Sequence, residues 1–279
     1  MKPDIKIGFI GAGNMAEAFI CALTKNNEAA RIQISDPDSQ RMTLLKNKYH
    51  VTSVYSNKEV FENNDIVIFA VKPQIIKTVL TEVKPSKLDT HRLMISIAAG
   101  IQIKTLAQIL YNDLNEESHS LLPIIRVMPN TPSLIQFGMS AYCGNTFATE
   151  NDMQIVHNIL ASMGKVIAVD ESQMDAITAV SGSGPAYFFY FVESMIQAAN
   201  NFGFSEEQSK LLVLQTAEGA LQLMKQPDAC PIQLRKKVTS KGGTTEAAIA
   251  EMDSHAVKNV IINAIAQAEK RAKELSQLE

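Results

Sequence analysis

The sequence has no tryptophan, and its 279 residues include only three cysteines and five histidines. Cys21, Cys143 and Cys230 lie far apart and form no CxxC pair, which argues against a disulfide framework and favours reduced thiols in the cytoplasm. The histidines are equally scattered, and a metal centre needs ligands that are brought together. We therefore expect a cytoplasmic protein that holds no metal.

The chain also lacks a strong charge of either sign, because 26 basic and 29 acidic residues leave a net charge of −3. Proteins that bind nucleic acid or a membrane surface need clustered positive charge, so neither partner is expected. Glycines interrupt the first residues before an apolar region of signal-peptide length can form. The longest uncharged stretch, residues 176–192, contains two glycines and a proline and is too short to span a bilayer.

What the first half does contain is an alternation of short apolar runs with helical or polar segments. This order is typical of a parallel β-sheet covered by helices. The predicted strands are Ile5–Ile10, Arg31–Ser35, Ile66–Ala70, Leu93–Ile97 and Ile124–Val127, with Ser140–Cys143 and Lys165–Val169 as further candidates. The polar stretch Asn112–Ser120 is predicted to be a surface loop.

The second part of the chain, from about Asp170, shows helical patterns and no convincing strand. Ser205 followed by Gln208 predicts a capping box at a helix start, and residues 257–272 carry one apolar stripe at helical spacing. We therefore predict an α/β domain at 1–169 and an all-helical domain at 170–279. Several apolar helix faces in so small a domain suggest that it pairs with a second copy of itself.

The stretch "GFIGAGNMAEAF" follows the first predicted strand and opens a helix. Gly11 permits the tight turn, Gly13 lets the backbone approach a pyrophosphate, and Ala16 allows the helix to pack close to the strand. A glycine turn without a ligand is the alternative interpretation. The strand–loop–helix context favours a dinucleotide-binding site in a Rossmann-type domain with a mostly parallel sheet.

The end of the second strand bears on which dinucleotide binds. Asp36 suits the free ribose 2′-hydroxyl of NAD, whereas Ser35, Ser39 and Arg41 beside it suit a 2′-phosphate. These residues leave the choice between NAD and NADP open.

Three later strands end in segments that also suit the cofactor edge of such a sheet. "AVKP" carries Lys72, a candidate phosphate ligand or a solvated loop residue. "SIAAG" has small residues against which a nicotinamide ring or a helix can lie. "RVMPNTP" is bounded by proline, and its Asn130 faces the cofactor or makes the turn.

The order of "GFIGAGNMA", "AVKPQ", "SIAAG", "RVMPNTP", "SGSGPAY" and "SKGGTT" resembles that of the pyrroline-5-carboxylate reductase family over nearly the whole chain. The resemblance implies a nicotinamide-dependent reductase that makes L-proline from the cyclic imine 1-pyrroline-5-carboxylate. It also implies a Rossmann domain followed by an all-α dimerisation domain. The small-molecule substrate and a homodimer, often assembled further into rings, are the implied partners.

The resemblance assigns cofactor-binding positions, with NADP (NADPH) as the favoured cofactor and NAD as the alternative that Asp36 allows. The cofactor-binding residues are Ile10, Gly11, Ala12, Gly13, Asn14, Met15, Asp36, Asn57, Ala70, Val71, Lys72, Pro73, Ala98, Ala99 and Gly100. Two departures stand out. Asp36 replaces the hydroxyl residue common in members that favour NADPH, and Lys241 replaces a proline, which is expected to loosen the following turn.

The Gly-Gly-Thr-Thr turn near the end of the chain is the predicted substrate site. Paired glycines before a helix let backbone N–H groups converge on an anion, so the amides of Gly243, Thr244 and Thr245 are expected to bind the substrate carboxylate. The Thr245 hydroxyl is the catalytic candidate that orients the imine nitrogen, since hydride adds readily to an iminium and needs mainly positioning. The alternative is that Ser240 or Thr244 merely caps the helix.

Two competing functions remain open in the sequence. A β-hydroxyacid dehydrogenase has the same domain order, but Phe188 and Phe189 occupy the place where its catalytic lysine is expected. A non-catalytic dinucleotide sensor would use the helical domain only for assembly.

Overall fold

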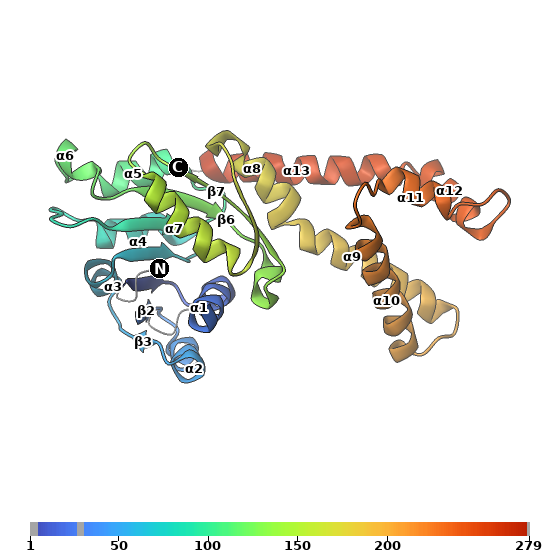
Figure 1. The fold of residues 1–279 in the computed structure, drawn as a ribbon, viewed down its shortest axis with the longest axis horizontal. Helices are drawn as coiled ribbons and strands as arrows, with labels where there is room; N and C mark the ends of the chain where they lie inside the picture. The colour runs from blue at the N-terminus through green and yellow to red at the C-terminus, as the bar shows by residue number, and fades with distance from the viewer. Residues whose placement is uncertain (1–4, 27–30, 278–279) are drawn as a thin grey trace. The chain divides into compact units, whose positions relative to one another are not determined.

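The structure, a computed structural model, describes residues 5–26 and 31–277 (Figure 1). The chain forms two compact units, one of Met1–Ser183 with Ala268–Glu279 and one of Gly184–Gln267. The last strand ends at Ala168, and the described residues that follow are helices and turns. The change from α/β to helical character thus falls where the sequence predicts it, whereas the division into domains at residues 169 and 170 stays a prediction.

The first unit is built on one sheet of eight strands in the order β3-β2-β1-β4-β5-β6-β7-β8. Neighbouring strands are parallel throughout except for the antiparallel pair β6 and β7. The predicted α/β fold with a mostly parallel sheet is confirmed, and all seven predicted strands are present. The strands are β1 (Lys6–Ile10), β2 (Arg31–Ser35), β3 (Thr52–Ser53), β4 (Ile66–Phe69), β5 (Leu93–Ser96), β6 (Ile124–Met128), β7 (Gly138–Gly144) and β8 (Gly164–Ala168).

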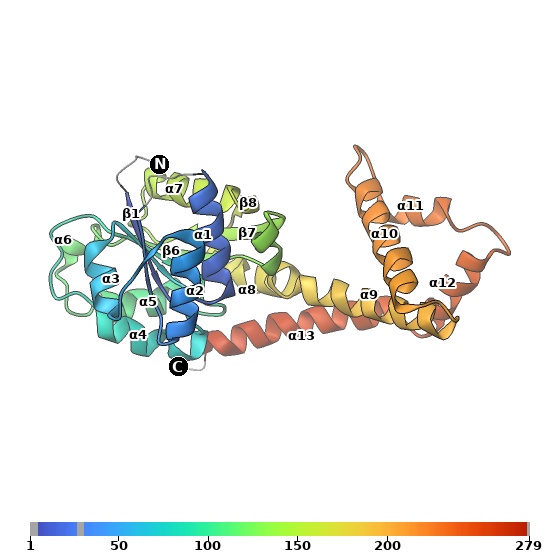
Figure 2. The same ribbon diagram turned by 90° about the horizontal axis from the view of Figure 1, so that it is seen from below.

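Helices cover both faces of this sheet, and its central strands β1, β4, β5 and β6 are buried on both sides. In β1, Ile7 and Phe9 belong to one buried cluster and Ile10 to another, as the alternation of side chains along a strand requires. Figure 2 shows α4 and α5 on one side of the sheet and α7 on the other. The helices of this unit are α1 (Asn14–Asn26), α2 (Ser39–Tyr49), α3 (Asn57–Asn63), α4 (Ile76–Val83), α5 (Ile103–Leu110), α6 (Glu116–His119), α7 (Glu150–Ala161) and α8 (Met174–Ile177).

Short helical turns complete the first unit. They are the 3₁₀ turns η1 (Pro73–Ile75), η2 (Thr131–Ile135) and η3 (Glu171–Gln173), and the π-helical segment η4 (Thr178–Gly182). The prediction that Asn112–Ser120 is only a loop is wrong, because α6 lies within it. The Asn115 side chain accepts the Ser118 N–H at the start of α6, and the His119 ring stacks on Tyr111 at 4.4 Å.

The second unit contains α9 (Gly184–Asn201), α10 (Glu206–Met224), α11 (Pro231–Lys237), α12 (Thr244–Ser254) and the first half of α13 (Val257–Gln277), up to Gln267. The predicted capping box is confirmed, since Ser205 accepts the Gln208 N–H and Gln208 accepts the Ser205 N–H. The aromatic run in α9 is largely exposed, with 66% exposure at Phe189 and 74% at Tyr190. Such an apolar surface is characteristic of an interface between subunits.

No helix among the described residues combines the length and the apolar character that crossing a bilayer requires.

The pairing of β7 with β8 depends on a glycine at the start of β8. Gly164 has φ of +147°, and a Cβ there would lie 2.0 Å from the Gly138 carbonyl oxygen and 2.6 Å from the Gly138 nitrogen. Backbone atoms cannot move aside without breaking the strand pair. We expect Gly164→Ala to lower the free energy of unfolding by about 2–4 kcal/mol in urea titrations. Lys165→Ala, at an exposed position of the same strand, is the control, and equal stability of the two variants would contradict this account.

Candidate active site

Three of the predicted cofactor segments meet at one edge of the sheet. Residues 10–15 leave β1, residues 70–73 leave β4, and residues 98–100 follow β5. Because β1 and β4 are neighbours whose connections run in opposite directions along the sheet, their carboxyl ends form the crevice in which open α/β sheets bind ligands. The structure thus brings these segments together as a single edge.

The glycine loop after β1 is shaped by close backbone contacts. Gly11 has φ of +100°, donates its N–H to the Ser35 carbonyl at 2.8 Å, and leaves no room for a Cβ, which would lie 2.6 Å from the Ala70 oxygen. A Cβ at Gly13 would meet no atom within 4 Å. The loop therefore presents open space directly before α1, whose first backbone N–H groups have no intrahelical acceptor. These features fit a pyrophosphate.

The Asp36 side chain is turned toward this loop. Its Oδ2 accepts the Ala12 N–H at 2.7 Å, and its Oδ1 accepts the Asp38 N–H at 2.8 Å. Arg41 donates from Nε to the Ala12 carbonyl at 2.7 Å. The Asp36 carboxylate, directly after β2, thus binds the N–H of Ala12, and the Arg41 guanidinium of α2 binds its carbonyl. Ala12 is the residue between Gly11 and Gly13.

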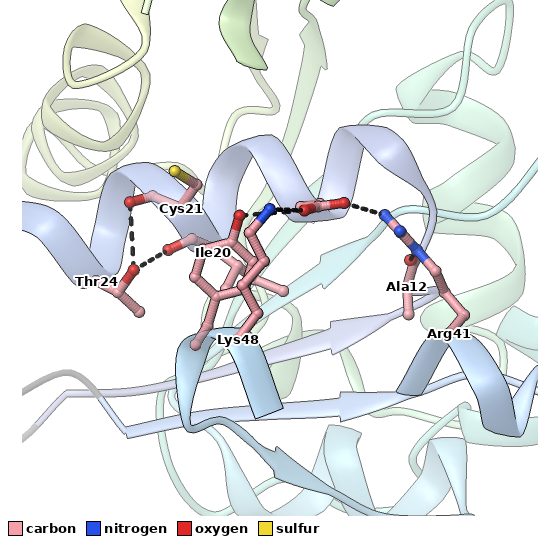
Figure 3. A network of polar contacts seen from close by, with 8 residues as sticks. Ala12, Ile20, Cys21, Thr24, Arg41 and Lys48 are labelled. Atoms are coloured by element: carbon pink, nitrogen blue, oxygen red, sulfur yellow. Dashed lines mark hydrogen bonds and ion pairs between the residues drawn. The ribbon is translucent and has the colours of Figure 1, made fainter. Parts of the chain in front are cut away.

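A second carboxylate, Glu17 on α1, binds three side chains of α2. Figure 3 shows Arg41 and Lys48 reaching α1 from α2. Glu17 accepts hydrogen bonds from Arg41, from Lys48 at 2.9 Å and from Tyr49 at 3.1 Å. Burial alone would raise the pKa of Glu17, but these bonds outweigh it and lower the pKa below its ordinary value. No pattern in the sequence points to Glu17, because an acidic residue in a first helical turn does not reveal partners up to 32 positions away.

Asn57 joins the end of β2 to two helices. Its side-chain oxygen accepts the Ser35 hydroxyl at 2.8 Å, and its amide donates to Glu82 of α4 at 2.8 Å. Asn57 is thereby fixed next to Ser35 at the end of β2. Lys72, in contrast, is exposed in the loop after β4.

The small residues after β5 are closely packed. Ala98 and Gly100 are buried, Ala99 is partly buried, and Gly100 has φ of +77°. The positive φ restricts this position to glycine, so the backbone can bend sharply at the sheet edge.

The segment after β6 is tied to the turn that precedes α9. Asn130 accepts the Met139 N–H at 2.9 Å and donates to the Ser181 carbonyl at 3.2 Å. Arg126, in the preceding strand β6, is 2% exposed and pairs with Asp175 of α8 at 3.0 Å. These bonds hold Asn130 within its loop, and a contact between Asn130 and the cofactor stays a prediction.

The Gly-Gly-Thr-Thr turn opens α12 as predicted. The N-cap is Gly243, with no side-chain cap, so neither Ser240 nor Thr244 fills that role. Gly242 has φ of +75°, and the Gly243 N–H donates to the Ser240 carbonyl at 3.0 Å. This bond closes the turn and leaves the amides of Thr244 and Thr245 at the positive end of the helix.

No group of three or more potential metal-binding side chains occurs in the part of the chain that the structure describes.

The fold and its glycine loop define a dinucleotide-binding oxidoreductase. Residues 6–100 match the family described as NADP oxidoreductase, coenzyme F420-dependent. Residues 171–275 match the family described as pyrroline-5-carboxylate reductase dimerisation.

Relatives over the full length narrow this class to one family. The pyrroline-5-carboxylate reductase of Pseudomonas aeruginosa is 37% identical over 98% of this chain and 97% of its own. That of Arabidopsis thaliana is 36% identical over 98% of this chain and 96% of its own. The crystal structure of the Plasmodium falciparum pyrroline carboxylate reductase with NADP bound has a TM-score of 0.86 and 33% identity, covering 98% of this chain and 99% of that one. The chain belongs to the pyrroline-5-carboxylate reductase family, which confirms the resemblance.

The Glu17 contacts predict a pH-dependent contribution to stability. Because the pKa of Glu17 is lowered in the folded state, its contribution is complete above the unfolded-state pKa of about 4.3 and is lost as the pH falls through the folded-state value. We expect Glu17→Gln to lower the free energy of unfolding by about 1–3 kcal/mol at pH 7, with a smaller difference from wild type at pH 3–4. Urea titrations across this range measure it. Glu59→Gln, at an exposed position of α3, is the control. If the difference in free energy of unfolding between wild type and Glu17→Gln is the same at every pH, the lowered pKa of Glu17 is refuted.

Proposed function

We propose that this protein is an NADP(H)-dependent reductase that converts 1-pyrroline-5-carboxylate to L-proline, a step of proline biosynthesis. The observation that carries the proposal is the full-length match to pyrroline-5-carboxylate reductases at 37% identity. The glycine loop at the sheet edge and the Gly-Gly-Thr-Thr helix start supply the two kinds of anion site that cofactor and substrate require.

The residues at the sheet edge fit a nicotinamide dinucleotide, which supplies a hydride when bound. Residues 10–15 would hold the pyrophosphate, Asn57 the adenosine portion, and residues 70–73 and 98–100 the remaining length. NADP is the bound dinucleotide in the Plasmodium falciparum relative. Asp36 fits this choice here, since both its oxygens already accept backbone N–H groups and Arg41 lies against the same residue, Ala12. A 2′-phosphate would then lie near the Asp36 carboxylate, whose negative charge is partly offset by two backbone N–H groups, and near the positive charge of Arg41.

For the substrate, we assign the carboxylate to the amides at the start of α12 and the imine nitrogen to Thr245. The amides of Thr244 and Thr245 face outward from the positive helix end, while that of Gly243 already donates to Ser240 and would have to share its bond. Thr245 is partly buried in the first turn of α12. Positioning of this kind suits an imine, whose nitrogen can take its proton from water.

The Thr245 assignment predicts a loss of catalytic efficiency without its hydroxyl. We expect Thr245→Ala to lower kcat/KM for the imine by about 10- to 100-fold, a change of about 1.4–2.8 kcal/mol in transition-state stabilisation. Thr245→Ser, which keeps the hydroxyl, is the matched control and should lose much less. Steady-state oxidation of NADPH and NADH measures both activity and cofactor preference. Unchanged kinetics in Thr245→Ala would remove this residue from the mechanism.

The same assay separates this function from its competitors. A panel of β-hydroxyacids offered with NADP tests the dehydrogenase alternative, against which Phe188 and Phe189 argue because neither side chain can transfer a proton. A dinucleotide sensor would bind NADPH but oxidise it with neither substrate class.

We further propose that the protein forms homodimers through residues 171–275, that the dimers assemble into rings, and that it acts in the cytoplasm. The match to a dimerisation family and the exposed apolar faces of α9 and α10 support the dimer. The free thiols of Cys21, Cys143 and Cys230 support a reducing compartment.

The dimer proposal predicts that a charge on the exposed face of α9 prevents assembly. We expect Phe189→Asp to shift the mass measured by light scattering at micromolar concentration from a dimer or larger ring to a monomer, because the charge would be desolvated in an apolar interface. Lys165→Asp, at an exposed site of the first unit, is the control. A monomeric wild type would refute the proposal.

A further inference from the structure

The turn before α12 is held by one side chain in addition to its backbone. The Glu246 carboxylate, in the first turn of the helix, accepts the Gly242 N–H through Oε2 at 2.6 Å. A bond from a backbone amide to a carboxylate is charge-assisted and stronger than one between neutral groups. Glu246 thus ties the residue two positions before the helix to the helix itself.

Packing contributes little to this restraint. A Cβ at Gly242 would meet no atom within 4 Å, and both Gly242 and Lys241 are exposed. Glycine loses more conformational freedom on ordering than any other residue, so Gly242, whose Cβ position is open, needs other restraints. Two hydrogen bonds supply them: Gly243 to the Ser240 carbonyl, and Gly242 to Glu246.

The bonded carboxylate leaves the predicted anion site accessible. Glu246 binds the amide of Gly242, and Gly242 lies outside the helix. Thr244 and Thr245 are the first two residues of α12. Their N–H groups have no partner one turn earlier in a helix that starts at Thr244. The side chain therefore fixes the turn from one side without taking the amides assigned to the substrate.

We infer that Glu246 is a positioning residue for the substrate carboxylate: by accepting the Gly242 N–H, it keeps the Gly-Gly turn in the conformation that aims the Thr244 and Thr245 amides at the substrate. The inference rests on the proposed function. It assigns the effect to the hydrogen-bond acceptor and not to the negative charge, which would repel a second carboxylate.

Two substitutions separate the acceptor from the charge. Glu246→Ala removes both, and we expect it to raise KM for 1-pyrroline-5-carboxylate by about 5- to 10-fold while kcat and KM for NADPH change by less than about twofold, since the weakened contact is a binding contact. The inhibition constant of L-proline, which carries the same carboxylate, should rise by a similar factor. Glu246→Gln keeps an oxygen acceptor without the charge, and its KM should stay within about threefold of wild type.

Glu251→Ala is the matched control, because Glu251 lies on the same helix and pairs with His255 at its far end. Its KM values should equal those of wild type. Thermal unfolding of all variants identifies a general loss of stability, which would lower kcat with the active fraction and leave KM unchanged.

Three results would overturn the inference: an unchanged KM in Glu246→Ala, a lowered KM in Glu246→Ala, or a Glu246→Gln variant that behaves like Glu246→Ala. The second would show that the charge repels the substrate. In each case wild-type activity and a defective Thr245→Ala variant would leave the proposed function intact. Inactivity of the wild-type protein with the imine would instead remove the function itself.

Discussion

The close approach of the β1 and β4 connections is the constraint on which the crevice at the carboxyl edge of the sheet depends. Gly11 lies so near the Ala70 carbonyl that a single added carbon would be 2.6 Å from its oxygen. This approach places the glycine loop across the point where the strand order reverses, and the hydrogen bond from Gly11 to Ser35 fixes it to the end of β2 as well. Asp36, Arg41 and the start of α1 take their places around the loop that results.

The second unit is stabilised in a different way from the first. Its helices leave aromatic and aliphatic side chains exposed, and Val213 and Ser209 are among the few buried residues. A unit of this kind gains most of its stability when it covers those faces with a partner. The helix start at Gly243 lies in this unit, so the rigidity of the Gly-Gly-Thr-Thr turn depends on local hydrogen bonds more than on a surrounding core.

Regular patterns in the sequence predicted most of the fold. Apolar runs located seven strands, and cap residues such as Ser205 located helix starts, because both depend on neighbouring residues. The two elements that the sequence did not predict, β3 and α6, are short. β3 has two residues and no period to detect, and α6 depends on an Asn115 cap and on the stacking of His119 with Tyr111.

The sequence by itself determined the class, the family and the location of the two glycine turns, because these depend on residue types at fixed spacing along the chain. The tertiary structure decided what each polar side chain binds. It turned Asp36 toward Ala12, joined Glu17 to Arg41, and bonded Asn130 to the Ser181 carbonyl. Partners up to 51 positions apart meet only after the sheet has formed, so no local pattern records them.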